Sequence, residues 1–560
     1  MSENQRNTET SSTVAHHIVT SAPPNPNGDL HLGHLSGPFL GADVLTRHLR
    51  QRGGNVSYVG YSDEHSCYVP RRAAELGSTA HRTALTFGSR MEETLALGAM
   101  HHDWFTRPLT TPRHDEIVQR FFTGLWEQGR LEVRTLPVFW CAHCERELYE
   151  AEVRGECQFC GAASDGVYCE ACGLPQEPAA LAAPRCTACR QTPEVRELER
   201  VCFPLGQYRD RLLAYYERAQ QSAEWRPRLR AYLETLFSRE LPLTPISRRA
   251  AYGIPVPLDG WDGHILDTWF SGIFGYVAAT ACLTSARGEP DAWERLWSDP
   301  ETRIVNFIGF DCSFSHAVLW PALLMAHGGM TLPSQVVINE FYRLEGDKFS
   351  TSRDHAVWGG EFLRRVSADA LRFHLCLTGP EREQTNFAAK EFAATVETVL
   401  IQGVELWTRT VLAAVAADFG GAVPAGVPTA ADGPAAALPQ ELAEALAGSL
   451  GAAAFSPQAA ASALAASIAA AVADLPELAR LRGTGEAYAR RVGAHVEALA
   501  TVAVTAAAIM PGWSEYLAGH LNVPIDRATR MPAWPAGAAR LVAPGTALPA
   551  TLPAFFHDVS

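Results

Sequence analysis

The tetrapeptide His31-Leu32-Gly33-His34 places two imidazole side chains one helical turn apart. It follows a β-branched run, HHIVTS, and a Pro/Asn/Gly turn, and it opens an apolar-periodic segment that continues to about Arg50. Helix N-terminal amides and two imidazoles can stabilise the charge that develops on nucleotide phosphates during in-line displacement. Two surface histidines would explain the same residues, so the motif indicates a phosphate site only together with further signals.

A second signal of this kind is the segment KFSTSR, residues 348–353, which follows the strand-like INEFYRLEG and a Gly-Asp turn. We expect a mobile loop that clasps pyrophosphate through two cations and three hydroxyls. These groups belong to Lys348, Arg353, Ser350, Thr351 and Ser352. In isolation the segment would more often be an ordinary charged loop.

The cysteines indicate metal. Eight of the 13 form four Cys-x-x-Cys pairs within about fifty residues: Cys141/Cys144, Cys157/Cys160, Cys169/Cys172 and Cys186/Cys189. Such pairs at short separations predict two structural zinc sites, each with four thiolates. Redox-active dithiols are the alternative, but they would not need four copies so close together.

The elements that must position these residues alternate between strand and helix, which predicts a doubly wound parallel sheet. The sheet is split in sequence by the cysteine segment and resumes in ETRIVNFIGFDCSFSHAVLWPALLM and SQVVINEFYRLEGDKF. Beyond about Asn386 we expect alanine-rich helices and no strands. The predicted α/β organisation is a disordered tail (1–15), the first catalytic half (16–135), the cysteine insertion (136–240), the second catalytic half (241–335), a linking segment with the basic loop (336–385) and an all-α bundle (386–560).

Composition is that of a folded globular protein of several domains, with 560 residues, 47% hydrophobic and 19% charged. The net charge of −14 argues against a general nucleic-acid coating protein but is compatible with a local basic surface that binds one RNA. The polar start MSENQRNTETSS does not resemble a secretory signal, and we expect no apolar run of membrane-spanning length and character. We therefore expect a cytoplasmic protein with no membrane partner.

The two phosphate motifs occur in the order and separation typical of class I aminoacyl-tRNA synthetases. The chain is most similar to methionyl-tRNA synthetases of the type that carries two zinc knuckles. Over residues 16–400 the resemblance rests on TSAPPNPNGDLHLGH, YSDEH, the four cysteine pairs, ISRRAAYGIPVP, LDTWFSGIFGY, NFIGFDCSFSHAVLWPALL and KFSTSR.

This resemblance implies amino-acid activation with ATP, Mg²⁺ and two structural Zn²⁺, and it implies a pairing of the first with the fourth knuckle and of the second with the third. Catalytic roles fall on His31, His34, Lys348, Ser350 and Ser352. ATP binding is implied for Asn27, Gly28, Gly33, Gly309, Thr351 and Arg353. Amino-acid binding is implied for Ala22, Pro23, Asn25, Asp63, Trp269, Tyr276, Asp311, Cys312, His316 and Trp320, with Asp63 holding the ammonium group.

Three departures from the family pattern bear on specificity. The usual Leu-Pro-Tyr before the histidine motif is Pro23-Pro24-Asn25, which removes a backbone donor and a hydroxyl from the site where a thioether would bind. Thr351 stands where the family has a second lysine, so a cation for the leaving pyrophosphate is missing. The helical region also lacks the family's anticodon-reading pattern, which makes reading of a methionine anticodon doubtful.

Three hypotheses follow. The first is a methionine–tRNA ligase with a divergent pocket. The second is a paralogue that activates another amino acid for specialised metabolism, with a small molecule or second amino acid as acceptor. Synthetase-like modules that form N–N bonds as hydrazine synthetases are an example, although they usually accompany a cupin domain that this chain lacks. The third is a catalytically silent regulator, against which both motif histidines and Asp63 argue.

Overall fold

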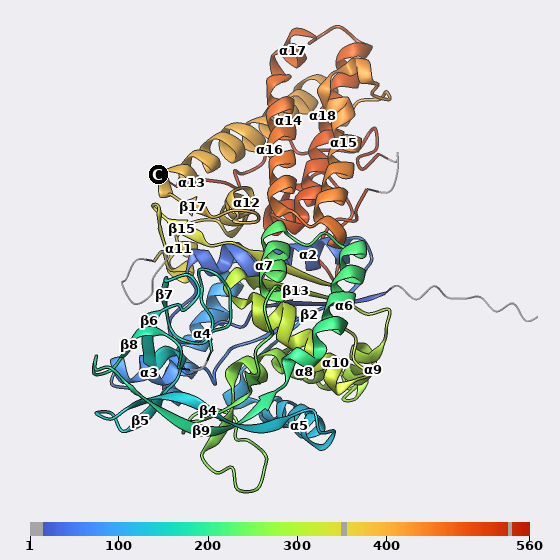
Figure 1. Ribbon diagram of the computed structural model, residues 1–560. Coiled ribbons are helices and arrows are strands. Elements are labelled where there is room, and N and C mark those ends of the chain that lie inside the picture. The colour runs from blue at the N-terminus through green and yellow to red at the C-terminus, as the bar shows by residue number, and fades with distance from the viewer. Residues whose placement is uncertain (1–14, 178, 349–355, 536–539, 560) are drawn as a thin grey trace, which may run out of the picture.

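Figure 1 shows the computed structural model, which describes residues 15–177, 179–348, 356–535 and 540–559. A twisted parallel sheet lies at the centre of the molecule. A cysteine-bearing insertion built from small antiparallel sheets lies below it in this view, and a helical bundle lies above it. The predicted α/β fold with an inserted ribbon and a C-terminal helical region is confirmed.

The central sheet has the order β14-β13-β1-β2-β3, with every neighbouring pair parallel. The strands are β1 His16–Ser21, β2 Asn55–Tyr61, β3 Trp104–Thr106, β13 Arg303–Gly309 and β14 Gln335–Asn339. Since β1 lies between β2 and β13, the chain before the insertion and the chain after it build one sheet. The sheet is split in sequence as predicted.

Helices cover both faces of this sheet, which explains why its middle strands are almost continuously buried. Side chains alternate along β1, so that Val19 packs in the core shared with α2 and the bundle while Ile18 packs in the core shared with α5 and α8. The helices are α1 Leu32–His34, α2 Leu40–Gln51, α3 Tyr68–Glu75, α4 Ala80–Leu97, α5 Pro112–Glu127, α8 Thr268–Ala286, α9 Ala292–Ser298 and α10 Trp320–His327.

The insertion leaves the sheet through a long antiparallel ribbon of β4 Glu132–Cys141 and β9 Glu194–Phe203. The cysteine pairs lie in and around the short strands at the end of this ribbon and beyond it, and the chain returns through two helices that pack on the catalytic core. The remaining elements here are β5 Arg146–Leu148, β6 Val153–Glu156, β7 Ala163–Ser164, β8 Ala182–Cys186, α6 Arg209–Ser222, α7 Pro227–Phe237, β10 Thr244–Pro245, β11 Ser247–Arg249 and β12 His264–Leu266.

The C-terminal part begins with a small sheet and continues as long helices (orange to red in Figure 1). Strand β17 spans residue 386, where we expected strands to have ended, because it pairs with β15 next to the catalytic sheet. The elements are β15 Tyr342–Leu344, β16 Asp347–Lys348, α11 Gly359–Leu363, α12 Ala368–Thr378, β17 Thr385–Phe387, α13 Ala389–Thr395, α14 Leu406–Phe419, α15 Pro434–Leu450, α16 Pro457–Ala473, α17 Leu475–Arg480, α18 Glu486–Thr505 and α19 Pro511–His520.

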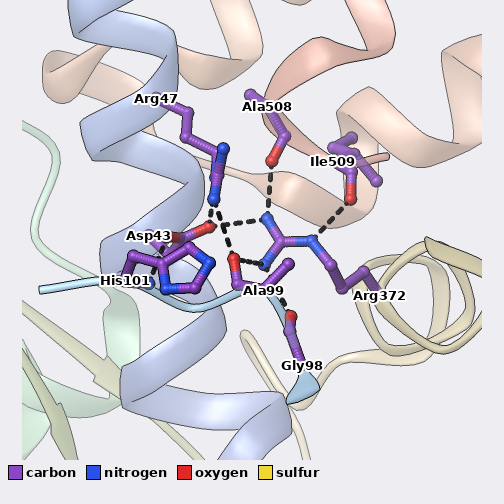
Figure 2. A network of polar contacts seen from close by, with 8 residues as sticks. All are labelled: Asp43, Arg47, Gly98, Ala99, His101, Arg372, Ala508 and Ile509. Atoms are coloured by element: carbon purple, nitrogen blue, oxygen red, sulfur yellow. Dashed lines mark hydrogen bonds and ion pairs between the residues drawn. The ribbon is translucent and has the colours of Figure 1, made fainter. Parts of the chain in front are cut away.

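A buried ion pair joins the bundle to the catalytic half (Figure 2). Arg372 on α12 is 1% exposed and donates to the Asp43 carboxylate on α2 (2.7 Å) and to the carbonyl oxygens of Ala508 and Ile509 (both 2.8 Å). Burial opposes ionisation of Asp43, but Arg47 and Arg372 lower the pKa of its carboxyl to about 2. The bundle is therefore fixed to the helix that follows the histidine motif.

Three helical segments reach the length and hydropathy of a membrane span by composition alone: Thr268–Ala286, Ala389–Phe419 and Pro457–Arg480. Our expectation that no segment has this character is wrong by these two criteria. In the structure α8 packs against β2 and α5, and α14 and α16 pack against each other and α18. Their apolar residues thus contribute to protein cores.

Candidate active site

The loops that follow β1, β2 and β13 meet at one edge of the sheet, because the carboxyl ends of parallel neighbours share an edge. Pro23 follows β1, Asp63 follows β2 and Asp311 follows β13. The Asp63 amide donates to the Pro24 carbonyl (2.9 Å), and the Ala22 amide donates to the Phe307 carbonyl (2.8 Å). These bonds fix three loops from distant parts of the sequence side by side.

The two motif histidines lie at the start of the helix that leads into α2. Their rings stack with centroids 3.7 Å apart, and each Nδ1 accepts the backbone N–H of the other residue, at 3.2 and 3.3 Å. A neutral imidazole that accepts at Nδ1 carries its proton at Nε2. Burial lowers the pKa of His34 to about 4, so this ring is neutral at pH 7. His34 can therefore offer phosphate a hydrogen bond but not a charge.

A cavity of about 280 Å³ opens beside these strand ends. Eight of the predicted residues line it: Pro23, Asn25, Asn27, Asp63, Trp269, Asp311, Cys312 and His316. The structure therefore brings together residues from four separate motifs.

Two predicted aromatic residues lie behind the cavity wall. Tyr276 and Trp320 are both fully buried, and the Tyr276 hydroxyl lies 2.8 Å from His316 Nε2. Burial lowers the pKa of His316 to about 4, which leaves its ring neutral. Tyr276 therefore positions His316, and Trp320 packs against Tyr276. Ala22 continues β1 and packs against the core.

The predicted ATP residues are only partly described. Gly28 belongs to the turn before the histidine motif, and Gly33 lies between the two histidines. Gly309 ends β13, where a Cβ would lie 2.5 Å from Asp311 Oδ1, so a side chain here would displace that carboxylate. The backbone of Lys348 lies in β16. Ser350, Thr351, Ser352 and Arg353 lie outside the described residues, so their roles stay predictions.

The opposite side of the cavity comes from the insertion, and the sequence did not single it out. Glu150, Asp165, Tyr168 and Glu170 line the cavity together with Tyr68 of α3. Trp269 Nε1 donates to the Glu150 carboxylate (3.1 Å), and Tyr168 packs edge-on against the Trp269 ring with centroids 4.5 Å apart. The available signal was the acidic string YEAE directly after the first cysteine knuckle.

The carboxyls of this cavity are held in an environment that disfavours their charge. Burial raises the pKa of Asp63 well above its usual range, and the neighbouring Glu150 raises it further while Arg248 opposes the shift. Burial likewise raises the pKa of Glu150 to about 7. Strongly shifted acids in a cleft are typical of functional sites.

The eight knuckle cysteines form two groups of four, with all sulfur atoms of a group within 4.8 Å of one another. One group is Cys141, Cys144, Cys186 and Cys189, and the other is Cys157, Cys160, Cys169 and Cys172. The closest Sγ atoms lie 3.4–3.9 Å apart, near the roughly 3.8 Å expected between ligands of a tetrahedral Zn–S site. Both groups fit zinc, and the nested pairing is confirmed.

The parallel sheet, the histidine motif at its edge and the strand-end cavity define an ATP-dependent ligase of the class I aminoacyl-tRNA synthetase type. Residues 17–411 match the family described as tRNA synthetases class I (M), and the chain belongs to this methionyl-tRNA synthetase family.

Sequence relatives agree with this assignment, and a solved structure agrees with the fold. The methionine–tRNA ligase of Thermomicrobium roseum is 35% identical over 412 residues, which are 73% of this chain and 70% of that protein. The ligase of Chlorobaculum tepidum is 33% identical, over 73% of this chain and 59% of that protein. The Mycobacterium tuberculosis methionyl-tRNA synthetase bound by methionyl-adenylate matches in fold, with a TM-score of 0.77 at 21% identity, and the match covers 96% of this chain and 99% of that one.

Proposed function

We propose that this chain joins an amino acid to the α-phosphate of ATP within the strand-end cavity. A carboxylate oxygen of the amino acid attacks the α-phosphorus, the bond to the β-phosphate oxygen breaks, and pyrophosphate leaves with the bonding electrons. Mg²⁺ bound to the ATP phosphates would neutralise part of their charge. No side-chain nucleophile is needed, so the protein contributes orientation and electrostatic stabilisation.

The roles of the residues follow from their positions. Asp63 binds the α-ammonium group, because it is a buried carboxylate at the cavity wall for which the described residues show no hydrogen-bond partner at the side chain. His31 and His34 donate from Nε2 to phosphate oxygens, since their Nδ1 atoms are engaged by backbone amides. Lys348, with Ser350 and Ser352, holds the leaving pyrophosphate.

Methionine is not the preferred amino acid in this proposal. Pro23 lacks the backbone N–H that could meet a thioether, and Asn25 places an amide where the family has a phenol. A site built around hydrogen bonds rejects a ligand that lacks the matching group more strongly than an apolar slot does. In this proposal the pocket selects a different amino acid, and has not simply become less selective for methionine.

The acyl acceptor is a tRNA or a small molecule. The relatives are named methionine–tRNA ligases, which favours tRNA. The helical region lacks the family's anticodon-reading sequence pattern, which favours an acceptor that needs no anticodon reading. ATP and either acceptor fit a cytoplasmic location.

Amino-acid-dependent exchange of pyrophosphate into ATP tests the proposal. The panel holds the proteinogenic amino acids and polar non-proteinogenic ones, including N-hydroxylated ornithine and lysine, each with and without bulk tRNA. Exchange with an amino acid other than methionine supports the proposal. Methionine as the best substrate, with transfer to its tRNA, would establish an ordinary methionine–tRNA ligase, and no exchange with any amino acid would favour a silent regulator.

A further inference from the structure

The amino-acid cavity is lined by more carboxyl groups than the one that an α-ammonium group would engage. Five carboxyl groups line it, those of Asp63, Glu150, Asp165, Glu170 and Asp311, and the described lining contains no lysine or arginine. His316 is its single imidazole and is neutral, because burial lowers its pKa to about 4. An α-ammonium group bound at Asp63 neutralises one of these acids. Asp165 is paired with Arg154 (2.7 Å).

Glu150 lines the cavity as a buried acid for which the described residues offer no compensating cation. It is only 8% exposed, and its hydrogen bonds come from Trp269 Nε1 and from the Cys67 thiol, both neutral donors at 3.1 Å. Among the described residues no cation lies within 4.0 Å of it. Arg248 is near, but its guanidinium stacks on the Tyr149 ring at 4.7 Å. A buried carboxylate without a cation is unfavourable unless a ligand supplies one.

Two further observations support a ligand at this place. Asn25 lines the cavity and its Oδ1 is fully buried, yet this acceptor has no hydrogen-bond donor among the described residues. The backbone at Glu150 has φ 43°, a left-handed conformation that a glutamate rarely adopts. The fold thus holds Glu150 at the wall with its backbone in an unfavourable conformation, and among the described residues the buried acceptor Asn25 Oδ1 is left without a donor.

We propose that the amino acid activated here carries a second amine in its side chain, which Glu150 binds as an ammonium while Asp63 binds the α-ammonium. The substrate class is therefore a diamino acid, including forms in which the distal nitrogen bears a further small polar group. The Trp269 ring lies beside both ends of the ligand and packs on its methylene chain. This inference rests on the proposed amino-acid activation and names its substrate.

Pyrophosphate exchange with isosteric pairs tests the inference. The pairs are 2,4-diaminobutyrate with norvaline, ornithine with norleucine, and lysine with 2-aminoheptanoate. The best diamino acid should exceed its neutral isostere by about 30- to 5,000-fold in kcat/KM, as expected for a buried charge pair. Glu150→Gln should abolish this preference by raising KM for the diamino acid while KM for the isostere stays the same.

Glu156→Gln is the matched control, because Glu156 is an exposed acid of the same insertion outside the cavity lining, and it should keep the preference. A neutral isostere that reacts as well as its diamino partner would overturn the inference, as would a preference that survives in Glu150→Gln. If no amino acid supports exchange, the proposed function is wrong, and calorimetry then tests separately whether Glu150 binds the side-chain amine. Binding of a diamino acid that Glu150→Gln abolishes would support the inference, whereas no binding of any diamino acid would overturn it.

Discussion

The cavity has two walls of different origin. The strand-end wall, defined by Pro23, Asn25, Asp63, Asp311 and Cys312, grows from the central sheet. The insertion wall, defined by Glu150, Asp165, Tyr168 and Glu170, grows from the cysteine-bearing ribbon. The first wall is fixed by parallel strands and by the buried Asp43–Arg372 pair, whereas the second is held by short hairpins and two groups of four thiolates.

The two walls are expected to serve different parts of the reaction. The strand-end wall carries the α-ammonium acceptor Asp63 and lies beside the histidine motif, and its Pro23 and Asn25 disfavour a thioether. The insertion wall supplies Glu150 for the far end of the ligand's side chain. Substitutions in the two walls should therefore change different kinetic constants.

The largest effect is expected from breaking the support of the strand-end wall. Arg372→Met leaves Asp43 buried with one cation fewer and removes a donor from four carbonyl oxygens, of which that of Ala99 still accepts from Arg47. Removal of one partner of a buried pair costs about 3–5 kcal/mol, which chemical denaturation would measure as a lower free energy of unfolding. Arg382→Met removes an exposed pair with Glu224 and should change stability by less than about 0.5 kcal/mol. Equal losses in both variants would contradict the role given to the buried pair.

The next effect concerns the chemistry of the strand-end wall. His34→Ala removes a phosphate donor and should lower the rate of pyrophosphate exchange by about 10²–10³-fold with little change in KM for the amino acid. His520→Ala, on the exposed end of α19, serves as control and should keep full activity. An active His34→Ala protein would remove the histidine motif from the phosphate site.

The pH dependence of stability should report on the insertion wall. Burial, strengthened by Asp267 and opposed by Cys67, Arg248 and Trp269, raises the pKa of Glu150 from 4.5 to about 7. A raised pKa means that the folded state favours the protonated acid. The contribution of protonated Glu150 to the free energy of unfolding is therefore complete below pH 4.5 and is lost as pH rises through about 7.

Without ligand, wild type should therefore lose up to about 3 kcal/mol relative to Glu150→Gln between pH 5 and 8. Denaturation curves of the two proteins at each pH measure this difference. Parallel pH profiles of wild type and Glu150→Gln would show that Glu150 titrates as an ordinary acid.

The smallest effect is expected from the metal. The purified protein should contain two zinc ions, and Cys169→Ser should lose the one beside Tyr168 and Glu170. KM for the amino acid should then rise on the order of tenfold while KM for ATP stays unchanged. Cys282→Ser, in a buried thiol outside both groups, should keep both ions. A folded wild-type protein without zinc, or a rise in both KM values, would contradict the separation of the two walls.

The sequence predicted the strand-end wall far better than the insertion wall. Pro23, Asp63 and Asp311 lie in short motifs directly after strands, and the order of parallel strands brings such positions together. Glu150 and Glu170 meet Asp63 only after the ribbon folds back onto the sheet, and no local pattern encodes that return. The cysteine spacing predicted both zinc sites because four thiolates satisfy one metal whatever surrounds them.

The sequence motifs also did not distinguish residues that line the cavity from residues that pack behind its wall. Tyr276 and Trp320 share the aromatic pattern of Trp269, yet α8 and α10 place the first two behind the wall and the third on it. Which face of a nearly all-apolar helix meets a cavity depends on tertiary packing, since such a helix has no polar side to orient it.

The central claim is that both walls hold one amino acid during activation. A crystal structure with a non-hydrolysable aminoacyl-adenylate analogue of the best substrate tests it most directly. We predict the α-ammonium within hydrogen-bond distance of the Asp63 carboxylate and the end of the side chain at Glu150, beside Trp269. An analogue whose amino-acid part contacts the strand-end wall alone, with Glu150 unengaged, would contradict the account.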